Sequence, residues 1–148
     1  MRLGVISDVH ANRVALAAVL DDMPPVDRLV CAGDVVGYGP WPAECVELVR
    51  EHCAATVEGN HDRNVDTPNR YSMNTMAHEG LKLASERLPA PQREWLRSLP
   101  RTAELADDRV LLVHDHPEHV DEYVRPHSFP QMRPYLDDYD ACILGHTH

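Results

Sequence analysis

Apolar residues along the chain alternate between short β-rich runs and stripes with helical spacing. The runs 2–7 and 28–32 are rich in Leu, Val and Ile and each ends at a polar or glycine position. Between them apolar residues recur at i, i+3, i+4 and i+7, at Leu16, Val19, Leu20 and Met23. Asn12 stands where a helix N-cap belongs, and Pro24 and Pro25 end the pattern. Strand, helix and strand within about thirty residues predict a βαβ unit with parallel strands.

The same pattern continues through the middle of the chain. Pro42 opens a second predicted helix, followed by a strand over 55–58 and a surface loop over 66–69. Two further helices are expected, a long one and a shorter one over 92–99. The helical stripes consist of Cys45, Leu48, Val49 and His52 in the first helix and Ala77, Gly80, Leu81, Ala84 and Leu88 in the long one.

The last third of the sequence predicts a β-hairpin, a long loop and a final strand. The hairpin pairs 102–105 with 109–113 around Asp107-Asp108. The polar stretch 115–134 is expected to be mostly loop, with a helical turn near Gln131, and 141–144 forms the last strand. No repeat or linker interrupts the pattern, so we expect one α/β domain over residues 1–148.

Composition and charge narrow the class of protein. The 148 residues are close to the length of one domain, and 43% hydrophobic with 26% charged residues is typical of globular proteins. There are 24 acidic against 14 basic residues, a net charge of −10, and the only lysine is Lys82. Nonspecific nucleic-acid binding is therefore not expected, and the Asp-rich surface resembles that of proteins from high-salt cytoplasm. No apolar run is long enough to span a membrane, so we expect a cytoplasmic protein.

The cysteines give no sign of a disulfide framework or a zinc finger. Cys31, Cys45, Cys53 and Cys142 form no CxxC pair and no regular spacing. We therefore expect the cysteines to be buried, reduced thiols.

Metal-binding side chains follow five of the predicted strands, at the point where each strand ends. In α/β sheets the carboxyl ends of parallel strands gather ligands at one edge, so these side chains are expected to converge. They are Asp8 and His10, Asp34, the Gly59-Asn60-His61-Asp62 run, His114, and the Gly145-His146-Thr147-His148 run.

The spacing and type of these residues indicate a site for a divalent transition metal. Asp8 and His10, and likewise His146 and His148, are two positions apart, which places both side chains on the same side of an extended chain. Either pair could bind one ion or divide between two neighbouring ions. Carboxylate and imidazole ligands without thiolate favour manganese, iron, zinc or nickel over calcium or a structural zinc site.

Taken together, these blocks resemble the calcineurin-like metallophosphoesterase family. The five are Asp8-x-His10, Gly33-Asp34-x-x-Gly37, Gly59-Asn60-His61-Asp62, His114, and Gly145-His146-Thr147-His148, in the family's order from the first strand to the last residue. The run 33–40 is most similar to the small prokaryotic YfcE-like metallophosphatase or phosphodiesterase branch.

The resemblance implies a fold and a site. The fold would be a four-layer α/β/β/α sandwich with two metal ions, manganese being expected first, between the strand ends. Asp34 would bridge both ions, and His61 would bind neither but protonate the leaving oxygen or stabilise the transition state of phosphoester hydrolysis by metal-activated hydroxide. One ion would be held by Asp8, His10, Asp34 and His148, and the other by Asp34, Asn60, His114 and His146.

Other polar residues near these blocks have weaker assignments. Asn12, Tyr38 and Arg63 are candidate substrate contacts, with packing roles as the alternative. Asp62 is expected to orient His61 or cap the next segment. Asp115 stands where relatives often have glycine, and we expect it to support an imidazole ligand or to weaken the site's attraction for phosphate. No ligand role is expected for His52, His78, His116, His119 or His127.

The function expected from the resemblance is metal-dependent hydrolysis of a small phosphomonoester or phosphodiester. The alternatives are a non-catalytic scaffold on the same fold, a dinucleoside-polyphosphate hydrolase, or a protein phosphatase; Gly37 disfavours the last, whose members carry Gly-Asp-x-x-Asp-Arg-Gly. Relatives continue past the Gly-His-Thr-His run, so we expect a C-terminally truncated chain that lacks strands of the second sheet. The exposed edge would favour homo-oligomers.

Overall fold

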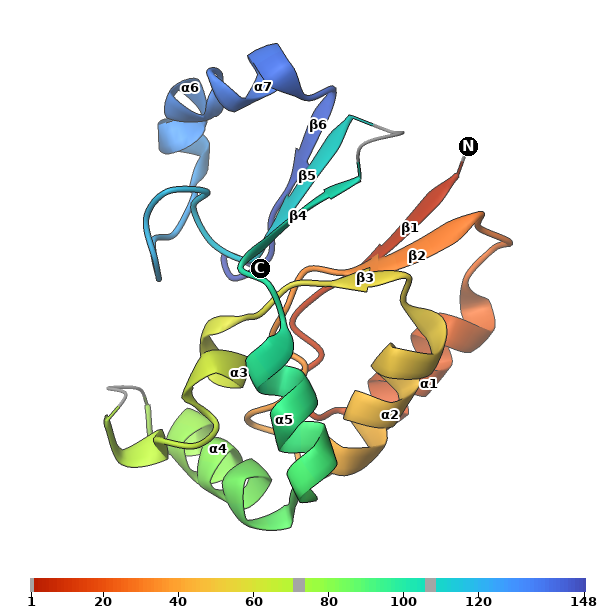
Figure 1. The fold of residues 1–148 in the computed structure, drawn as a ribbon, viewed down its shortest axis with the longest axis vertical. Helices are drawn as coiled ribbons and strands as arrows, with labels where there is room; N and C mark the ends of the chain where they lie inside the picture. Colours follow the sequence, from red (N-terminus) through yellow and green to blue (C-terminus); the bar gives the residue numbers. More distant parts are fainter. Residues whose placement is uncertain (1, 71–73, 106–108) are drawn as a thin grey trace.

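Two sheets form the centre of the molecule in the computed structural model, which describes residues 2–70, 74–105 and 109–148. Figure 1 shows the sheets facing one another, with helices on their outer sides. The first sheet pairs β1 (Leu3–Ile6), β2 (Arg28–Cys31) and β3 (Ala55–Thr56) in that order, and all three are parallel. This arrangement confirms the predicted βαβ unit.

The helical layer on the first sheet contains α1 (Arg13–Asp22), α2 (Pro42–His52), α4 (Thr75–Arg87) and α5 (Ala90–Ser98). Asn12 and Asn74 cap α1 and α4, each accepting a hydrogen bond from the backbone amide three residues on. The apolar stripes of these helices meet one face of the sheet. Buried members of this core include Leu16, Val46, Val49, Leu81, Ala84 and Leu96.

The second sheet consists of β4 (Thr102–Leu105), β5 (Val110–Val113) and β6 (Ala141–Ile143). The predicted hairpin is confirmed, because β4 and β5 are antiparallel, whereas β6 lies parallel to β5. Asp107-Asp108, expected in the turn, lies outside the described residues. Three short helices precede β6: η3 (Pro126–Ser128), α6 (Phe129–Met132) and α7 (Tyr135–Asp138), placed outside this sheet in Figure 1.

The sheets pack through a second apolar core. Val30, Ala32 and Val57 from the first sheet meet Leu105, Val110 and Leu112 from the second. Every residue of β5 is buried, as expected of a strand covered on both faces. The fold is therefore a mixed α/β sandwich, as predicted.

Several local predictions were wrong. The strand expected over 55–58 ends at Thr56, because the amide of Glu58 hydrogen-bonds Pro100 instead of a neighbouring strand. A short helix, α3 (Asn60–Asn64), follows it where a loop was expected. The loop expected over 66–69 overlaps the short helix η1 (Pro68–Arg70). The helical turn expected near Gln131 is confirmed as α6, which follows η3. Val19, expected in the core, is 47% exposed.

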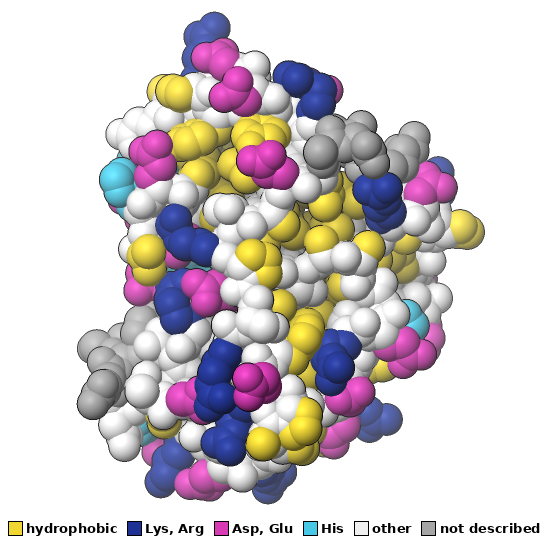
Figure 2. Space-filling model, in the orientation of Figure 1, with side chains coloured by type: hydrophobic (Ala, Val, Ile, Leu, Met, Phe, Trp, Pro, Cys, Tyr) yellow, Lys and Arg dark blue, Asp and Glu magenta, His cyan; other side chains and the backbone are white. Residues whose placement is uncertain are grey.

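The cysteines agree in part with the expectation of buried, reduced thiols. All four are free thiols, but only Cys31 and Cys45 are fully buried, whereas Cys53 and Cys142 are partly exposed. Burial raises the pKa of Cys45 and of Cys53 to about 12. Figure 2 shows acidic and basic side chains interspersed on the surface, with apolar side chains visible over the two sheets. Across the described ranges, no helix is both long enough and apolar enough to cross a membrane.

Candidate metal centre

The five predicted segments meet at the carboxyl ends of their strands, between the two sheets. Backbone hydrogen bonds join them directly: Asp8 donates to Gly33 (3.0 Å), His10 to Asp34 (2.9 Å), and Gly145 to His114 (2.9 Å). Because each of these bonds joins the segment after one strand to the segment after another, the side chains at these strand ends face a common space. The parallel pairings β1–β2 and β5–β6 place those strand ends at the same edge of each sheet.

Asp34 lies at the centre of this space and is 2% exposed. Its Oδ1 accepts a hydrogen bond from the His61 backbone amide (2.9 Å), and its Oδ2 lies 3.3 Å from Nε2 of His114 and 3.7 Å from Nε2 of His10. Burial alone would raise the pKa of Asp34, but the hydrogen bond and positive charge of His114 lower it below its ordinary value. The carboxylate is thus ionised and faces imidazoles on two sides.

His114 is oriented by a carbonyl on the opposite sheet. Its Nδ1 donates a hydrogen bond to the Ala32 carbonyl (2.7 Å), which leaves Nε2 facing Asp34 and Oδ1 of Asn60 (3.0 Å). Burial opposes protonation of His114, but the hydrogen bond to Asp34 outweighs it and raises the His114 pKa to about 9. His10 follows the same rule, with Nδ1 on the Val36 carbonyl (3.3 Å). Fixing Nδ1 in this way presents Nε2 to a metal.

His146 completes the cluster on the second sheet. It is 8% exposed, and its Nε2 is buried without a hydrogen-bond partner among the described residues. One ligand atom from each of Asp34, His114 and His146 lies within 4.8 Å of the others. Two imidazoles grouped with an ionised carboxylate form the environment expected of a metal site.

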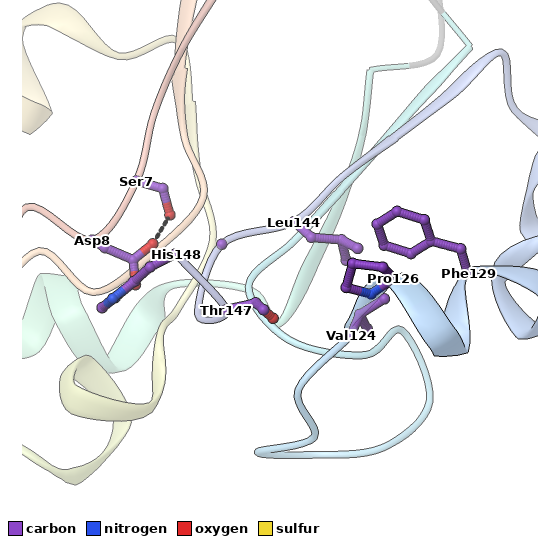
Figure 3. A pocket seen from close by; sticks show the side chains of 9 residues that line it. Ser7, Asp8, Val124, Pro126, Phe129, Leu144, Thr147 and His148 are labelled. Atoms are coloured by element: carbon purple, nitrogen blue, oxygen red, sulfur yellow. Dashed lines mark hydrogen bonds and ion pairs between the residues drawn. The ribbon is translucent and has the colours of Figure 1, made fainter.

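The opposite side of the centre contains Asp8, His10 and His148, whose ligand atoms also lie within 4.8 Å of one another. Nε2 of His148 is 3.0 Å from Oδ1 of Asp8, and Nε2 of His10 is 3.9 Å from the same oxygen. Figure 3 shows Asp8 and His148 side by side, with the Ser7 hydroxyl hydrogen-bonded to Asp8. The cavity in front of them is about 710 Å³ and has Val124, Pro126, Phe129 and Leu144 on its far side.

Backbone strain is concentrated in the same residues. Asp8, His10, Asp34, His146 and His148 all have positive φ angles, between 48° and 60°. Non-glycine residues rarely adopt this conformation, and it is retained where the surrounding structure fixes it for function. The strain turns each chain sharply at its strand end and directs the side chain inward.

Glycines allow the loops to approach each other closely. Gly33 has φ +91°, and a Cβ there would lie 2.8 Å from Nδ1 of His114. A Cβ on Gly59 would lie 2.2 Å from the backbone nitrogen of Asp34. Only glycine permits these approaches, which bring the loops of β2, β3 and β5 together.

The donor set fits divalent cations. The groups Asp8–His10–His148 and Asp34–His114–His146 each contain three of the four residues predicted to hold one ion, and the assignment of ligands to ions stays a prediction. His10, Asp34 and His61 form a third group. Asn60, the remaining predicted ligand, lies against His114. Carboxylate oxygens and imidazole nitrogens without thiolate suit manganese, iron, zinc or nickel.

Comparison with known proteins agrees with this geometry. The sequence profile of calcineurin-like phosphoesterases matches residues 1–148. The chain belongs to the calcineurin-like phosphoesterase family. The family binds divalent metals, which is the chemistry that the cluster of Asp and His side chains provides.

Two proteins are similar to this chain in sequence, and a third is similar in fold. The chain is 40% identical to a metallophosphoesterase from Sphaerobacter thermophilus, whose crystal structure matches all of this chain and 61% of its own with a TM-score of 0.83. It is 34% identical over 160 residues to an uncharacterized protein of Methanocaldococcus jannaschii, covering 99% of this chain and 62% of that protein. A hypothetical protein from Pyrococcus horikoshii OT3, 17% identical, shares the fold over 99% of this chain and 69% of its own, with a TM-score of 0.77. The chain thus spans about three fifths of the length of the first two.

The predicted non-ligand residue His61 lies inside the centre. It is 5% exposed, and its ring centroid is 4.8 Å from that of His10 and 5.2 Å from that of Tyr38. Burial lowers the pKa of His61 despite the nearby Asp34 carboxylate, so the imidazole is neutral near pH 7. Its position suits a donor to a bound phosphoryl group, and this role stays a prediction.

Two of the three predicted substrate residues line a cavity beside the metal centre, and the third is engaged elsewhere. Asn12 and Tyr38 line a cavity of about 620 Å³ beside Asp8, His10 and His148, although the Asn12 side chain also caps α1. The Tyr38 ring lies edge-on to His10 at 4.7 Å. Arg63 is already paired with carboxylates away from this cavity, and its contact with substrate stays a prediction.

The expectation that Asp62 caps the next segment is confirmed, whereas sequence reasoning missed the residues around His146. The Asp62 carboxylate accepts backbone hydrogen bonds from Gly59 (3.0 Å), Val35 (3.3 Å) and Val36 (3.1 Å). An acidic residue three positions after Gly59 is a capping-box signal that could have revealed the α3 helix. Tyr123 stacks on His146 at 4.2 Å, and the polar loop that carries Tyr123 offers no comparable signal.

Proposed function

We propose that the chain is a metal-dependent phosphoesterase that hydrolyses a phosphomonoester or phosphodiester at two divalent cations, with manganese expected first. The observation that carries the proposal is the central position of Asp34, buried between the ligand groups of the two predicted sites. A carboxylate in that position can be shared by two ions, and paired ions are the arrangement that phosphoryl transfer uses.

When bound, the two cations supply Lewis-acid stabilisation of the phosphoryl oxygens and lower the pKa of a coordinated water. The chain's own residues fix the geometry. Carbonyls of Ala32 and Val36 hold the imidazoles of His114 and His10 in the tautomer that presents Nε2. Both acceptor carbonyls follow β2, and the two histidines follow strands of different sheets. The two imidazoles are therefore oriented before any ligand binds.

His61 is proposed to act on the substrate from the side of His10. Its ring lies beside the rings of His10 and Tyr38, and a ring N–H in that position can donate to a phosphoryl or leaving-group oxygen. Tyr38 and Asn12 border the adjoining cavity and would contact the leaving group. The retention of every predicted ligand and of His61 supports catalysis over a scaffold role.

The proposal is tested by metal content and hydrolysis measured on the same preparations. Wild-type protein reconstituted with Mn²⁺ should hydrolyse bis-p-nitrophenyl phosphate or p-nitrophenyl phosphate and should lose this activity with EDTA. Asp34→Asn is the inactive reference, and Asp140→Asn, an exposed residue paired with Arg109, is the matched control. Wild-type activity on both substrates no higher than that of Asp34→Asn would refute the proposal.

A further inference from the structure

The orientation of His146 depends on a long loop, unlike that of His10 and His114. His10 and His114 donate Nδ1 hydrogen bonds to the carbonyls of Val36 and Ala32, which follow β2. The His146 ring instead donates a hydrogen bond to the main-chain carbonyl of Asp121, in the loop that follows His114. The position of that loop therefore determines which nitrogen of His146 faces the metal centre.

The same loop also covers the face of the imidazole. The Tyr123 ring stacks on His146 with centroids 4.2 Å apart and planes 19° apart, while His114 lies 5.1 Å away. The guanidinium of Arg125 in turn lies 5.2 Å from the centroid of the Tyr123 ring. The His146 ring is thus held by its hydrogen bond to the Asp121 main chain and by the Tyr123 ring stacked on its face.

Two arginines fix this loop to the rest of the molecule. Arg63, in α3, donates to Asp121 (2.9 Å) and to Glu58 (2.9 Å). Arg101 donates to the His116 and Pro117 carbonyls (both 2.8 Å).

Asp115 links these attachments. It is 3% exposed, accepts from Arg101 (3.3 Å) and from the Asp121 backbone amide (2.6 Å), and lies 3.9 Å from Arg63. Asp121 itself has a φ of +61°, a conformation that persists where the surroundings fix it. The carboxylate of Asp115 therefore holds the backbone of Asp121, and the guanidinium of Arg63 holds its side chain.

We infer that Arg63, Asp121 and Tyr123 are positioning residues for His146. The Arg63–Asp121 ion pair fixes the orientation of this ligand, because it joins the loop that contacts His146 to α3. The inference rests on the proposed function in that His146 is taken to bind a metal. The Asp121 main-chain bond holds the ring N–H, and the stacked Tyr123 ring prevents rotation. The ring is then held with one nitrogen within 4.8 Å of the ligand atoms of Asp34 and His114. Partners of this kind change metal affinity about 10–100-fold when removed.

The first test measures the tautomer of His146 in metal-free protein by ¹⁵N–¹H correlation of the histidine rings, with His146→Gln to assign the signals. Wild type should show a single tautomer. Tyr123→Ala and Arg63→Gln should show a mixture of tautomers, whereas Tyr123→Phe, which keeps the stacked ring, should match wild type. Tyr123 is 50% exposed, so its replacement should leave the protein folded.

The second test measures Mn²⁺ binding by calorimetry on the same proteins. Tyr123→Ala and Arg63→Gln should weaken one of two sites about 10–100-fold and leave the other unchanged. Arg109→Gln removes an arginine–aspartate pair at the start of β5, at the far end of the strand from His114, and should change neither site. Unchanged tautomer and unchanged affinity in folded Tyr123→Ala and Arg63→Gln would overturn the inference. A wild type that binds no Mn²⁺ would instead refute the proposed function, and the tautomer measurement would still decide the inference.

Discussion

The Asp62 carboxylate accepts a hydrogen bond from the backbone amide of Val36 (3.1 Å), although the two residues belong to different loops of the site. Through the same carboxylate Asp62 also holds the amides of Val35 and Gly59. The loop that carries Asp34 and the segment that carries Asn60 and His61 are therefore joined by one buried side chain. This junction fixes the central carboxylate relative to its neighbours before any metal binds.

Asp62→Ala should be strongly destabilising because it leaves three backbone N–H groups without their acceptor in a buried site. Each such group costs about 1–3 kcal/mol, so the free energy of unfolding should fall by about 3 kcal/mol or more. Urea unfolding monitored by circular dichroism would measure the loss, with the exposed Asp140→Ala as control. A loss below about 1 kcal/mol would show that Asp62 does not join the loops.

The framework of the site was predictable because it depends on local periodicity. The helical stripe around Leu16 and the β-rich runs at 28–32 and 110–113 follow directly from the 3.6 and 2.0 periods of side-chain direction. Once those strands are placed, Asp34 and His114 each lie at the carboxyl end of a strand. The two strands belong to different sheets, so the convergence of these side chains also requires the packing of one sheet on the other, which periodicity does not give.

The remaining features depend on contacts between residues far apart in the chain. The Arg63–Asp121 pair spans 58 residues, and neither residue lies in a periodic segment. The stacking of Tyr123 on His146 likewise depends on the path of a loop whose polar sequence is compatible with many conformations. The early end of β3 has the same origin, because the Glu58 amide finds its acceptor at Pro100.

The buried thiols should make stability fall at high pH. Burial raises the pKa of Cys45 and Cys53 to about 12, above the value of about 8.5 expected in the unfolded chain. Above about pH 8.5 the unfolded chain releases protons that the folded protein retains, so the free energy of unfolding should decrease as pH rises. Urea titrations at about pH 8 and about pH 10 would show the slope, which should be shallower in Cys53→Ala. Equal slopes in the two proteins would contradict the assignment.

Asp34→Asn should be the most damaging substitution among the proposed ligands. The Oδ2 atom of Asp34 faces both His10 and His114, so replacing the carboxylate by a neutral amide should weaken metal binding on both sides of the centre. Removing a partner of a ligand costs about 10–100-fold in metal affinity, and removal of a shared ligand should cost at least about 100-fold. Elemental analysis after gel filtration should find fewer ions than in wild type. Two retained ions with near-normal hydrolysis would refute the bridging role.

His61→Ala tests whether this side chain serves chemistry without binding metal. The imidazole lies within reach of both His10 and Asp34, so geometry alone permits a ligand role as well as a donor role. As a donor to the reacting phosphoryl or leaving group it should contribute about 10²–10⁴-fold to turnover, and metal content should stay at the wild-type level after its removal. The loss should be smaller for p-nitrophenyl esters than for alkyl esters, because a good leaving group needs less help from a donated proton. His52→Ala, an exposed histidine at the end of α2, is the matched control and should change neither quantity. If metal content fell in step with activity in His61→Ala, His61 would be a ligand, and the His10–Asp34–His61 group would be one of the metal sites.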